Sequence, residues 1–186
     1  MQGFSANMAR FYHLPSRGGG SQCDAPVVNA QAGYESMLTF SSAMQHGINL
    51  VMEAGGVLAS VNATSFDKMI VDFEIIRQVQ FASTPFEVSE ETLCLDDIKT
   101  IGHNGSYVTA DSTLDNFREL YMPRIGSRDA KSATYFEDSI DKEYARLMEE
   151  YESHRPHLDS QTLDKVKAIF VENGVSPQQL DAIEML

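Results

Sequence analysis

Two short runs of the chain end in glycines, and each run is followed by a segment whose apolar residues recur at helical spacing. The first run, LPSRGGG, covers residues 14–20, and the second, INLVMEAGG, covers residues 48–56. The second run is largely apolar, which is typical of a parallel strand that is buried on both faces. Two strand–helix pairs in succession therefore predict parallel strands in an α/β sheet or barrel.

The two helices are predicted over residues 30–47, with Gly47 as the stop, and over residues 65–82. In both segments the apolar residues follow steps of three and four, which predicts one buried stripe on each helix. The first stripe is Met37, Leu38, Phe40, Ala43 and Met44; the second is Phe66, Met69, Ile70, Phe73 and Ile76, with Asp67, Lys68, Asp72 and Glu74 mostly off it.

Two strands cannot by themselves bury both faces of a parallel sheet. A (β/α)₈ barrel typically has about 250 residues, whereas the strand–helix rhythm ends near residue 85. We therefore expect residues 1–85 to be the C-terminal part of a (β/α)₈ TIM barrel, an α/β fold. Residues 6–12 read as the last turns of a helix, which favours this interpretation. A small α/β sandwich completed by dimerisation is the alternative.

After residue 85 the pattern predicts helices alone. They are expected over residues 88–102, with Ser89 as the cap, and over residues 112–123, 139–156, 159–174 and 176–186. Residues 86–186 are therefore predicted to form a helical C-terminal extension. The highly charged segment at 139–156 is interpreted either as a solvated face or as a surface for a protein partner or for self-association, and a homo-oligomer is expected.

Acidic side chains outnumber basic ones by 27 to 14, which gives a formal net charge of −13. Such a surface repels phosphate backbones, so nucleic acid is not expected as a partner. No apolar run is long enough to span a membrane, and the N-terminus lacks the pattern of a signal peptide. Two cysteines are too few for a disulfide framework, and a cytoplasmic location is expected.

Four blocks of the sequence, in order, resemble the C-terminal region of the trimethylamine methyltransferase family. They read NAQAGYESMLTFSSAMQHGINLVMEAGG, MIVDFEIIRQV, SEETLCLDDIKTIGHNGSYV and STLDNFRELYMPRI, and the resemblance covers roughly residues 10–155. It implies a (β/α)₈ barrel longer than this chain. It also implies transfer of a methyl group from a methylated amine, such as trimethylamine or glycine betaine, to a corrinoid (cobalamin) carried by a partner protein. The chain alone is then expected to be inactive.

Four positions depart from the family pattern. Asn29 stands where the family usually has Asp, and Ala59 precedes Ser60 where a Glu-Ser pair is usual. Ala110 and Ser112 stand where the family has a His-x-His. These departures leave the substrate open, and they motivate an alternative, a non-catalytic assembly module from a split or degenerate gene. The absence of pyrrolysine from the chain favours quaternary amines, and a barrel enzyme that uses no corrinoid is a third interpretation.

The reaction requires a site that holds a cation, and aromatic faces and carboxylates do so. In barrels, ligands bind at the carboxyl ends of the strands, where both glycine runs fall. The residues predicted to bind the substrate or the corrinoid are Gly18, Gly19, Gly20, Asp24, Gln31, Tyr34, Glu53, Gly55 and Gly56.

Each of these assignments has a simpler alternative. The glycines turn the chain instead of admitting a ligand, and Glu53 is the first residue of a loop. Glu35 is interpreted as a residue that matches the dipole of its own helix. Cys23, Asp24 and His13 match no closed metal motif, so no metal site is predicted.

Overall fold

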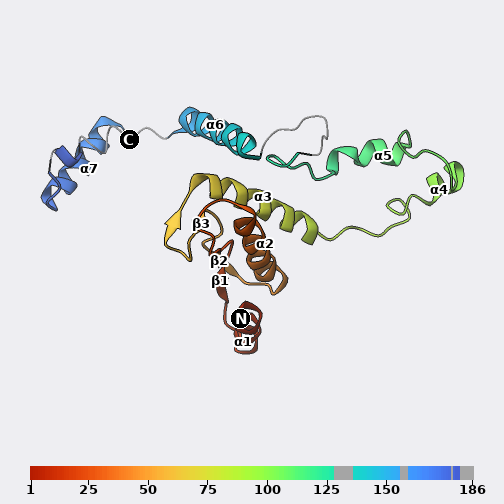
Figure 1. Ribbon diagram of the computed structural model, residues 1–186, viewed down its shortest axis with the longest axis horizontal. Helices are drawn as coiled ribbons and strands as arrows, with labels where there is room; N and C mark the ends of the chain where they lie inside the picture. Colours follow the sequence, from red (N-terminus) through yellow and green to blue (C-terminus); the bar gives the residue numbers. More distant parts are fainter. Residues whose placement is uncertain (128–135, 156–158, 177, 181–186) are drawn as a thin grey trace. The chain divides into compact units, whose positions relative to one another are not determined.

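The computed structural model describes residues 1–127, 136–155, 159–176 and 178–180 (Figure 1). The chain divides into two units, Met1–Arg146 and Leu147–Leu186. The predicted boundary between residues 85 and 86 stays a prediction.

The first unit begins with the predicted alternation of helix and strand. Its elements are α1 (Gln2–Phe11), β1 (Arg17–Gly19), α2 (Ala30–Gln45), β2 (Leu50–Met52) and α3 (Phe66–Ser83). β1 and β2 pair in parallel, with Arg17 opposite Leu50 and Gly19 opposite Met52. The parallel pairing predicted from the sequence is therefore confirmed, although both strands are shorter than the runs that suggested them.

A second small sheet was not predicted. β3 (Val57–Leu58) and β4 (Ala63–Thr64) pair antiparallel within the connection from β2 to α3. Val57 and Leu58 are buried. The turn between the two strands uses three consecutive residues with positive φ, Ala59 to Val61. Such a turn has no glycine signature, which is why the sequence did not reveal it.

Side-chain caps fix the starts of the two main helices. The Asn29 Oδ1 accepts a hydrogen bond from the Ala32 N–H at 3.0 Å, and the Ser65 Oγ accepts one from the Lys68 N–H at 3.4 Å. Gly47 has a φ of +61° just after α2, so the predicted glycine stop is confirmed. α2 packs against α3 (Figure 1).

The predicted stripes are confirmed only in part: Phe40, Ala43 and Ile70 are buried, and most of the other predicted residues are not. On α2 the buried residues are Ala32, Ser36, Phe40 and Ala43, and Leu38 is 70% exposed. On α3 Phe66 is 65% exposed, whereas the buried set is Lys68, Ile70, Val71, Asp72, Glu74, Ile75 and Val79. The buried Lys68 and Asp72 side chains form an ion pair with each other, so burial on α3 does not follow apolarity alone.

Beyond α3 the described residues form helices. They are α4 (Leu95–Ile101), α5 (Asp111–Asn116), the 3₁₀ helix η1 (Phe117–Glu119), α6 (Phe136–His154) and α7 (Ser160–Glu172). α4 begins later than predicted because Cys94, immediately before it, has a left-handed φ of 51°. Ser89 instead closes a turn, in which its Oγ accepts a hydrogen bond from the Thr92 N–H at 3.2 Å. Most of the predicted helix at 176–186 lies outside the described residues.

No described helix combines the length and the apolar character needed to cross a membrane.

Candidate functional site

The two strand ends meet at one edge of the parallel pair. Glu53 follows β2 directly, and Gln22 lies three residues beyond β1. The Gln22 Nε2 donates a hydrogen bond to the Glu53 Oε2 at 2.5 Å, and the Gly20 N–H donates to the Met52 carbonyl at 2.8 Å. Ligands of α/β folds bind at this edge. The geometry therefore brings the first glycine run and Glu53 together where a ligand site was predicted.

The glycines of the first run let the two strand ends approach each other. A Cβ added to Gly20 would lie 2.5 Å from the Ala54 Cα, and one added to Gly19 would lie 2.5 Å from the Gln22 side chain. A Cβ on Gly18 would meet Ile48 at 3.3 Å. Neighbouring atoms of the chain thus fill the space that these glycines leave open. Packing accounts for the glycines, and their contact with a ligand stays a prediction.

The loop after β1 is held by carboxylates. Glu35 on α2 accepts hydrogen bonds from the Asp24 N–H at 2.8 Å and from the Gln31 side chain at 2.9 Å. The Asp24 Oδ1 accepts a hydrogen bond from the Ser60 Oγ at 2.7 Å. Glu35 therefore holds the loop instead of serving the start of its own helix, which Asn29 caps. Of the predicted residues, Asp24 and Gln31 meet here through Glu35.

This loop and the turn at Ser60 line a groove of about 360 Å³, with Gln22, Asp24 and Glu35 among its walls. Tyr34 is 63% exposed on α2 and is not one of the lining residues. Gly55 and Gly56 lie in the turn after β2, where the Gly56 N–H donates to the Asp72 Oδ2 at 2.8 Å. The structure therefore groups the predicted residues around the two strand-end loops and leaves Tyr34 apart.

Beneath the loops lies a buried ion pair that sequence reasoning missed. The Lys68 Nζ is 2.6 Å from both carboxylate oxygens of Asp72, and both side chains have 0% exposure. Burial raises the pKa of the Asp72 carboxyl, and Lys68 opposes that shift. The signal in the sequence was the spacing of four residues between opposite charges on one helix.

Cys23 is buried beside this pair. Its Sγ donates to the Val57 carbonyl at 3.2 Å, and burial raises the pKa of the thiol. A thiol whose pKa is raised is a poor nucleophile, and Cys23 packs in a buried cluster with Ala25, Ala32 and Leu58. Within the part of the chain that the structure describes, no group of three or more His, Cys, Asp or Glu side chains is suited to a metal ion.

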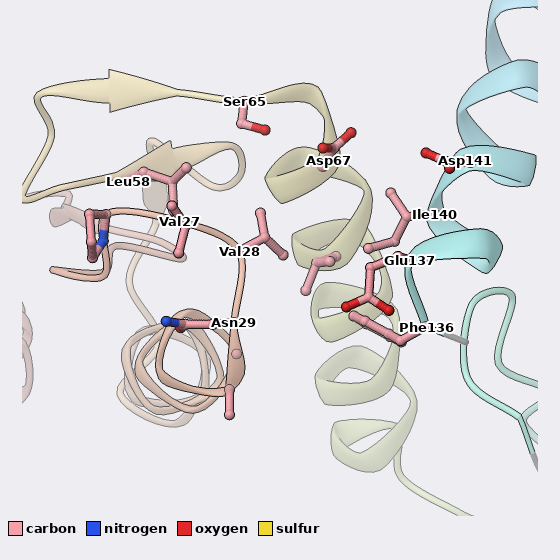
Figure 2. Close-up of a pocket in the computed structure, with 14 residues that line it drawn as sticks. Val27, Val28, Asn29, Leu58, Ser65, Asp67, Phe136, Glu137, Ile140 and Asp141 are labelled. Carbon is pink, nitrogen blue, oxygen red and sulfur yellow. The ribbon is translucent and has the colours of Figure 1, made fainter. Parts of the chain in front are cut away.

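A cavity of about 710 Å³ lies near the starts of α2 and α3 (Figure 2). Apolar side chains such as Val28 and Ile140 line it. The carboxylates of Asp67, Glu137 and Asp141 reach it from α3 and α6, as Figure 2 shows. None of the residues that line it belongs to the predicted site set.

Further along α3, the buried carboxylate of Glu74 anchors the segment after η1. It accepts hydrogen bonds from the Tyr121 hydroxyl and, at 2.9 Å, from the Arg124 N–H. The Arg77 guanidinium lies 3.6 Å from Glu74 and 5.5 Å from the centre of the Tyr121 ring. Burial, as the largest cause, and the neighbouring Glu74 carboxylate together raise the pKa of Tyr121 to about 12. The segment is thereby fixed to α3.

The departures from the family pattern have structural roles. Asn29 caps α2, and the Ala59 N–H donates to the Ala25 carbonyl at 2.9 Å. Ala110 is buried, and the Ser112 hydroxyl donates to the Asp97 carboxylate. The Asn29 and Ser112 side chains thus each make a hydrogen bond, Asn29 within its own helix start and Ser112 with the more distant Asp97.

Comparison with known proteins relates most of this chain to methyltransferases. The family model described as trimethylamine methyltransferase (MTTB) matches residues 1–173. A glycine betaine methyltransferase of Desulfitobacterium hafniense (strain Y51) is 33% identical over 175 residues, which are 91% of this chain and 36% of the relative. An L-carnitine:corrinoid methyltransferase of Eubacterium limosum is 27% identical over 169 residues, 89% of this chain and 35% of the relative.

A trimethylamine methyltransferase of Desulfitobacterium hafniense (strain DSM 10664 / DCB-2) is 27% identical over 154 residues, 81% of this chain and 31% of the relative. The chain thus spans about a third of the length of these three relatives. The family match covers nearly all of this chain, including both strand ends and the helices that follow them. The chain belongs to the trimethylamine methyltransferase family.

Proposed function

We propose that this chain supplies the C-terminal part of a corrinoid-dependent amine methyltransferase. In this proposal β1 and β2 are two strands of a (β/α)₈ barrel. The whole protein transfers a methyl group from a methylated amine, such as trimethylamine or glycine betaine, to a corrinoid carried by a partner protein. The observation that carries the proposal is the parallel pairing of β1 with β2, which brings both glycine-rich ends to one edge.

The exposure of β2 supports a larger sheet. Leu50 is 55% exposed and Met52 is 37% exposed, although strands of a parallel sheet are normally covered on both faces. Further strands of a barrel would cover these side chains. A larger fold around β1 and β2 therefore accounts for apolar surface that the described residues leave in contact with water.

At the strand ends the chain offers carboxylates for a cationic substrate. Glu53 and Asp24 are exposed, and a carboxylate near an ammonium group lowers the energy of the bound cation. In the reaction the N–CH₃ bond would break with its electron pair left on nitrogen, and the reduced corrinoid on the partner protein would accept the methyl group by supplying the electron pair of the new bond. The residues of this chain would hold and orient the amine and keep water away from the methyl group.

A chimera tests the proposal. This chain replaces the matching third of the glycine betaine methyltransferase relative, and methylation of the corrinoid protein is followed by absorbance with glycine betaine, trimethylamine and carnitine. We expect transfer with one of the amines, and we expect Glu53→Gln to weaken binding of that amine more than Glu91→Gln, a control on a surface turn. A folded chimera that methylates no corrinoid with any of the three would refute the proposal.

The 186-residue chain alone is expected to show no demethylation when the corrinoid protein and amine are added. The reason is that one pair of strands supplies only part of a barrel rim. Turnover by the chain alone would show that the site is complete without further strands.

A second candidate is a non-catalytic assembly module, favoured by Asn29, Ala59 and Ala110 at positions where the family has other residues. Capture experiments separate the two candidates. A methyltransferase part retains the corrinoid protein, whereas an assembly module captures copies of itself and no corrinoid carrier. Association into a homo-oligomer and a cytoplasmic location are part of the leading proposal and are tested by light scattering and by cell fractionation.

A further inference from the structure

One buried side chain reaches the loop after β1 and the helix that follows it. The Lys68 Nζ donates hydrogen bonds to the Ser36 Oγ at 2.8 Å and to the Ser21 carbonyl at 3.4 Å. The Ser36 hydroxyl in turn donates to the same Ser21 carbonyl at 3.2 Å. Ser21 directly precedes Gln22, whose side chain holds Glu53. Lys68 is therefore tied to the main chain at the first strand end.

The partner of Lys68 reaches the loop after β2. Asp72 accepts the hydrogen bond from the Gly56 N–H with the Oδ2 atom, which also lies 2.6 Å from Lys68. Gly56 has a φ of +84°, and Glu53, three residues earlier, has a φ of 52°. Residues other than glycine rarely adopt such left-handed backbone conformations. The backbone conformation of Glu53 therefore needs support from its surroundings.

We infer that Lys68 and Asp72 form a positioning pair, which couples the loops after β1 and β2 and thereby sets Glu53 relative to Gln22 and Asp24. The inference rests on the proposed function for its consequence in methyl transfer, but the coupling itself is a property of this chain. Neither residue lines the groove between the loop after β1 and the turn at Ser60, and both are completely buried. They act through the main chain of the two loops.

The chemistry of the pair supports positioning over simple stabilisation. A buried ion pair is costly to desolvate, and well-packed apolar side chains often replace one without loss of stability. Packing of α3 against α2 therefore does not require charges at these positions. The hydrogen bonds to Ser21 and Gly56, by contrast, have fixed directions that apolar side chains cannot reproduce.

Hydrogen exchange in the 186-residue chain tests the coupling. The double variant Lys68→Met/Asp72→Leu replaces the pair with apolar side chains of similar length and branching and removes both charges. We expect its urea midpoint to stay near that of the parent, while the amides of residues 20–24 and 53–56 exchange about tenfold faster or more. Amides near Val79, on the same helix, should be unchanged. Unchanged protection of both loops in the folded double variant would overturn the inference.

A second variant keeps the test decisive if the double variant does not fold. Ser36→Ala removes the hydroxyl that binds Lys68 and the Ser21 carbonyl but leaves the bond from Gly56 to Asp72. Exchange should rise at residues 20–24 and stay near the parent value at Gly56. Ser41→Ala, on the same helix, is the matched control and should alter neither loop. Equal effects of the two serine variants at residues 20–24 would contradict the coupling.

The consequence for the reaction is measured in the methyltransferase chimera described above. The double variant should lower kcat by about tenfold or more while KM changes less, because the substrate groups remain and only their geometry is lost. Asp72→Glu, which retains the charge, should recover part of the rate. If the parent chimera is inactive but the exchange results hold, the proposed function fails and the coupling stands. If the parent is active and exchange is unaffected, only the coupling fails.

Discussion

The contact between Tyr121 and Glu74 gives the sharpest prediction about stability. Tyr121→Phe removes one hydroxyl from a buried carboxylate and changes little else. A hydrogen bond to a charged group contributes about 1.5–3 kcal/mol. Glu74 keeps its bond from the Arg124 N–H and its contact with Arg77, so a loss near the lower end, about 1.5–2 kcal/mol, is expected.

Urea denaturation of the 186-residue chain measures this loss as a lower free energy of unfolding. Tyr107→Phe is the matched control, because its hydroxyl donates to the Gly102 carbonyl at 3.1 Å on an exposed surface. The control should stay within about 0.5 kcal/mol of the parent. If Tyr121→Phe and Tyr107→Phe cost the same, Glu74 does not anchor the segment and the reasoning is refuted.

The same contact predicts a dependence on alkaline pH. The pKa of Tyr121 is about 12 in the folded chain and about 10 in the unfolded chain, so the folded chain holds this proton more tightly. The contribution of Tyr121 to stability is therefore complete below pH 10 and is lost as the pH rises towards 12. The difference in stability between the parent and Tyr121→Phe should shrink across that window. A constant difference would contradict the assignment.

Four further predictions are tested by denaturation of the same chain. Asn29→Ala should cost about 1 kcal/mol by removing the cap of α2, whereas Asn29→Asp should keep the cap and gain about 0.3–1 kcal/mol from the helix dipole. Gly20→Ala should cost about 1–3 kcal/mol because its Cβ would lie 2.5 Å from backbone. By contrast, Gly33→Ala should stabilise the chain by about 0.5–1 kcal/mol, since nothing lies within 4 Å of that Cβ in α2. The hydrogen bond from Arg146 lowers the pKa of the Glu143 carboxyl in the folded chain. The contribution of Glu143 to stability should therefore be present above about pH 4.5 and be lost as the pH falls through the lowered pKa of the folded chain. Glu143→Gln should remove that pH dependence.

Local signals predicted the parts of the fold that depend on neighbours in sequence. Ser65 and Gly47 mark helix ends through side-chain and backbone chemistry that acts over three or four residues. The parallel pairing followed from the order of the elements and from the apolar run ending at Glu53. The helix ends depend on neighbours in sequence, and the pairing of Arg17–Gly19 with Leu50–Met52 was predicted from the order of the elements alone.

The features that the sequence did not reveal depend on contacts between distant residues. Apolarity placed Phe66 in the core of α3 and Lys68 outside it, and the structure shows the reverse. Lys68 is buried because Asp72, Ser36 and the Ser21 carbonyl meet it from three segments of the chain. The same holds for Glu35, which accepts hydrogen bonds from the Asp24 and Ala25 N–H groups in the loop before its helix.

The pairing of β1 with β2 alone has a practical consequence for handling the 186-residue chain. A two-stranded sheet in the described part of the chain has two outer edges, where N–H and C=O groups face outward. Such edges act as templates for strands of other molecules. Concentrated preparations should therefore aggregate by edge-to-edge addition, and a charge introduced at the exposed Leu50 by Leu50→Lys should delay that aggregation.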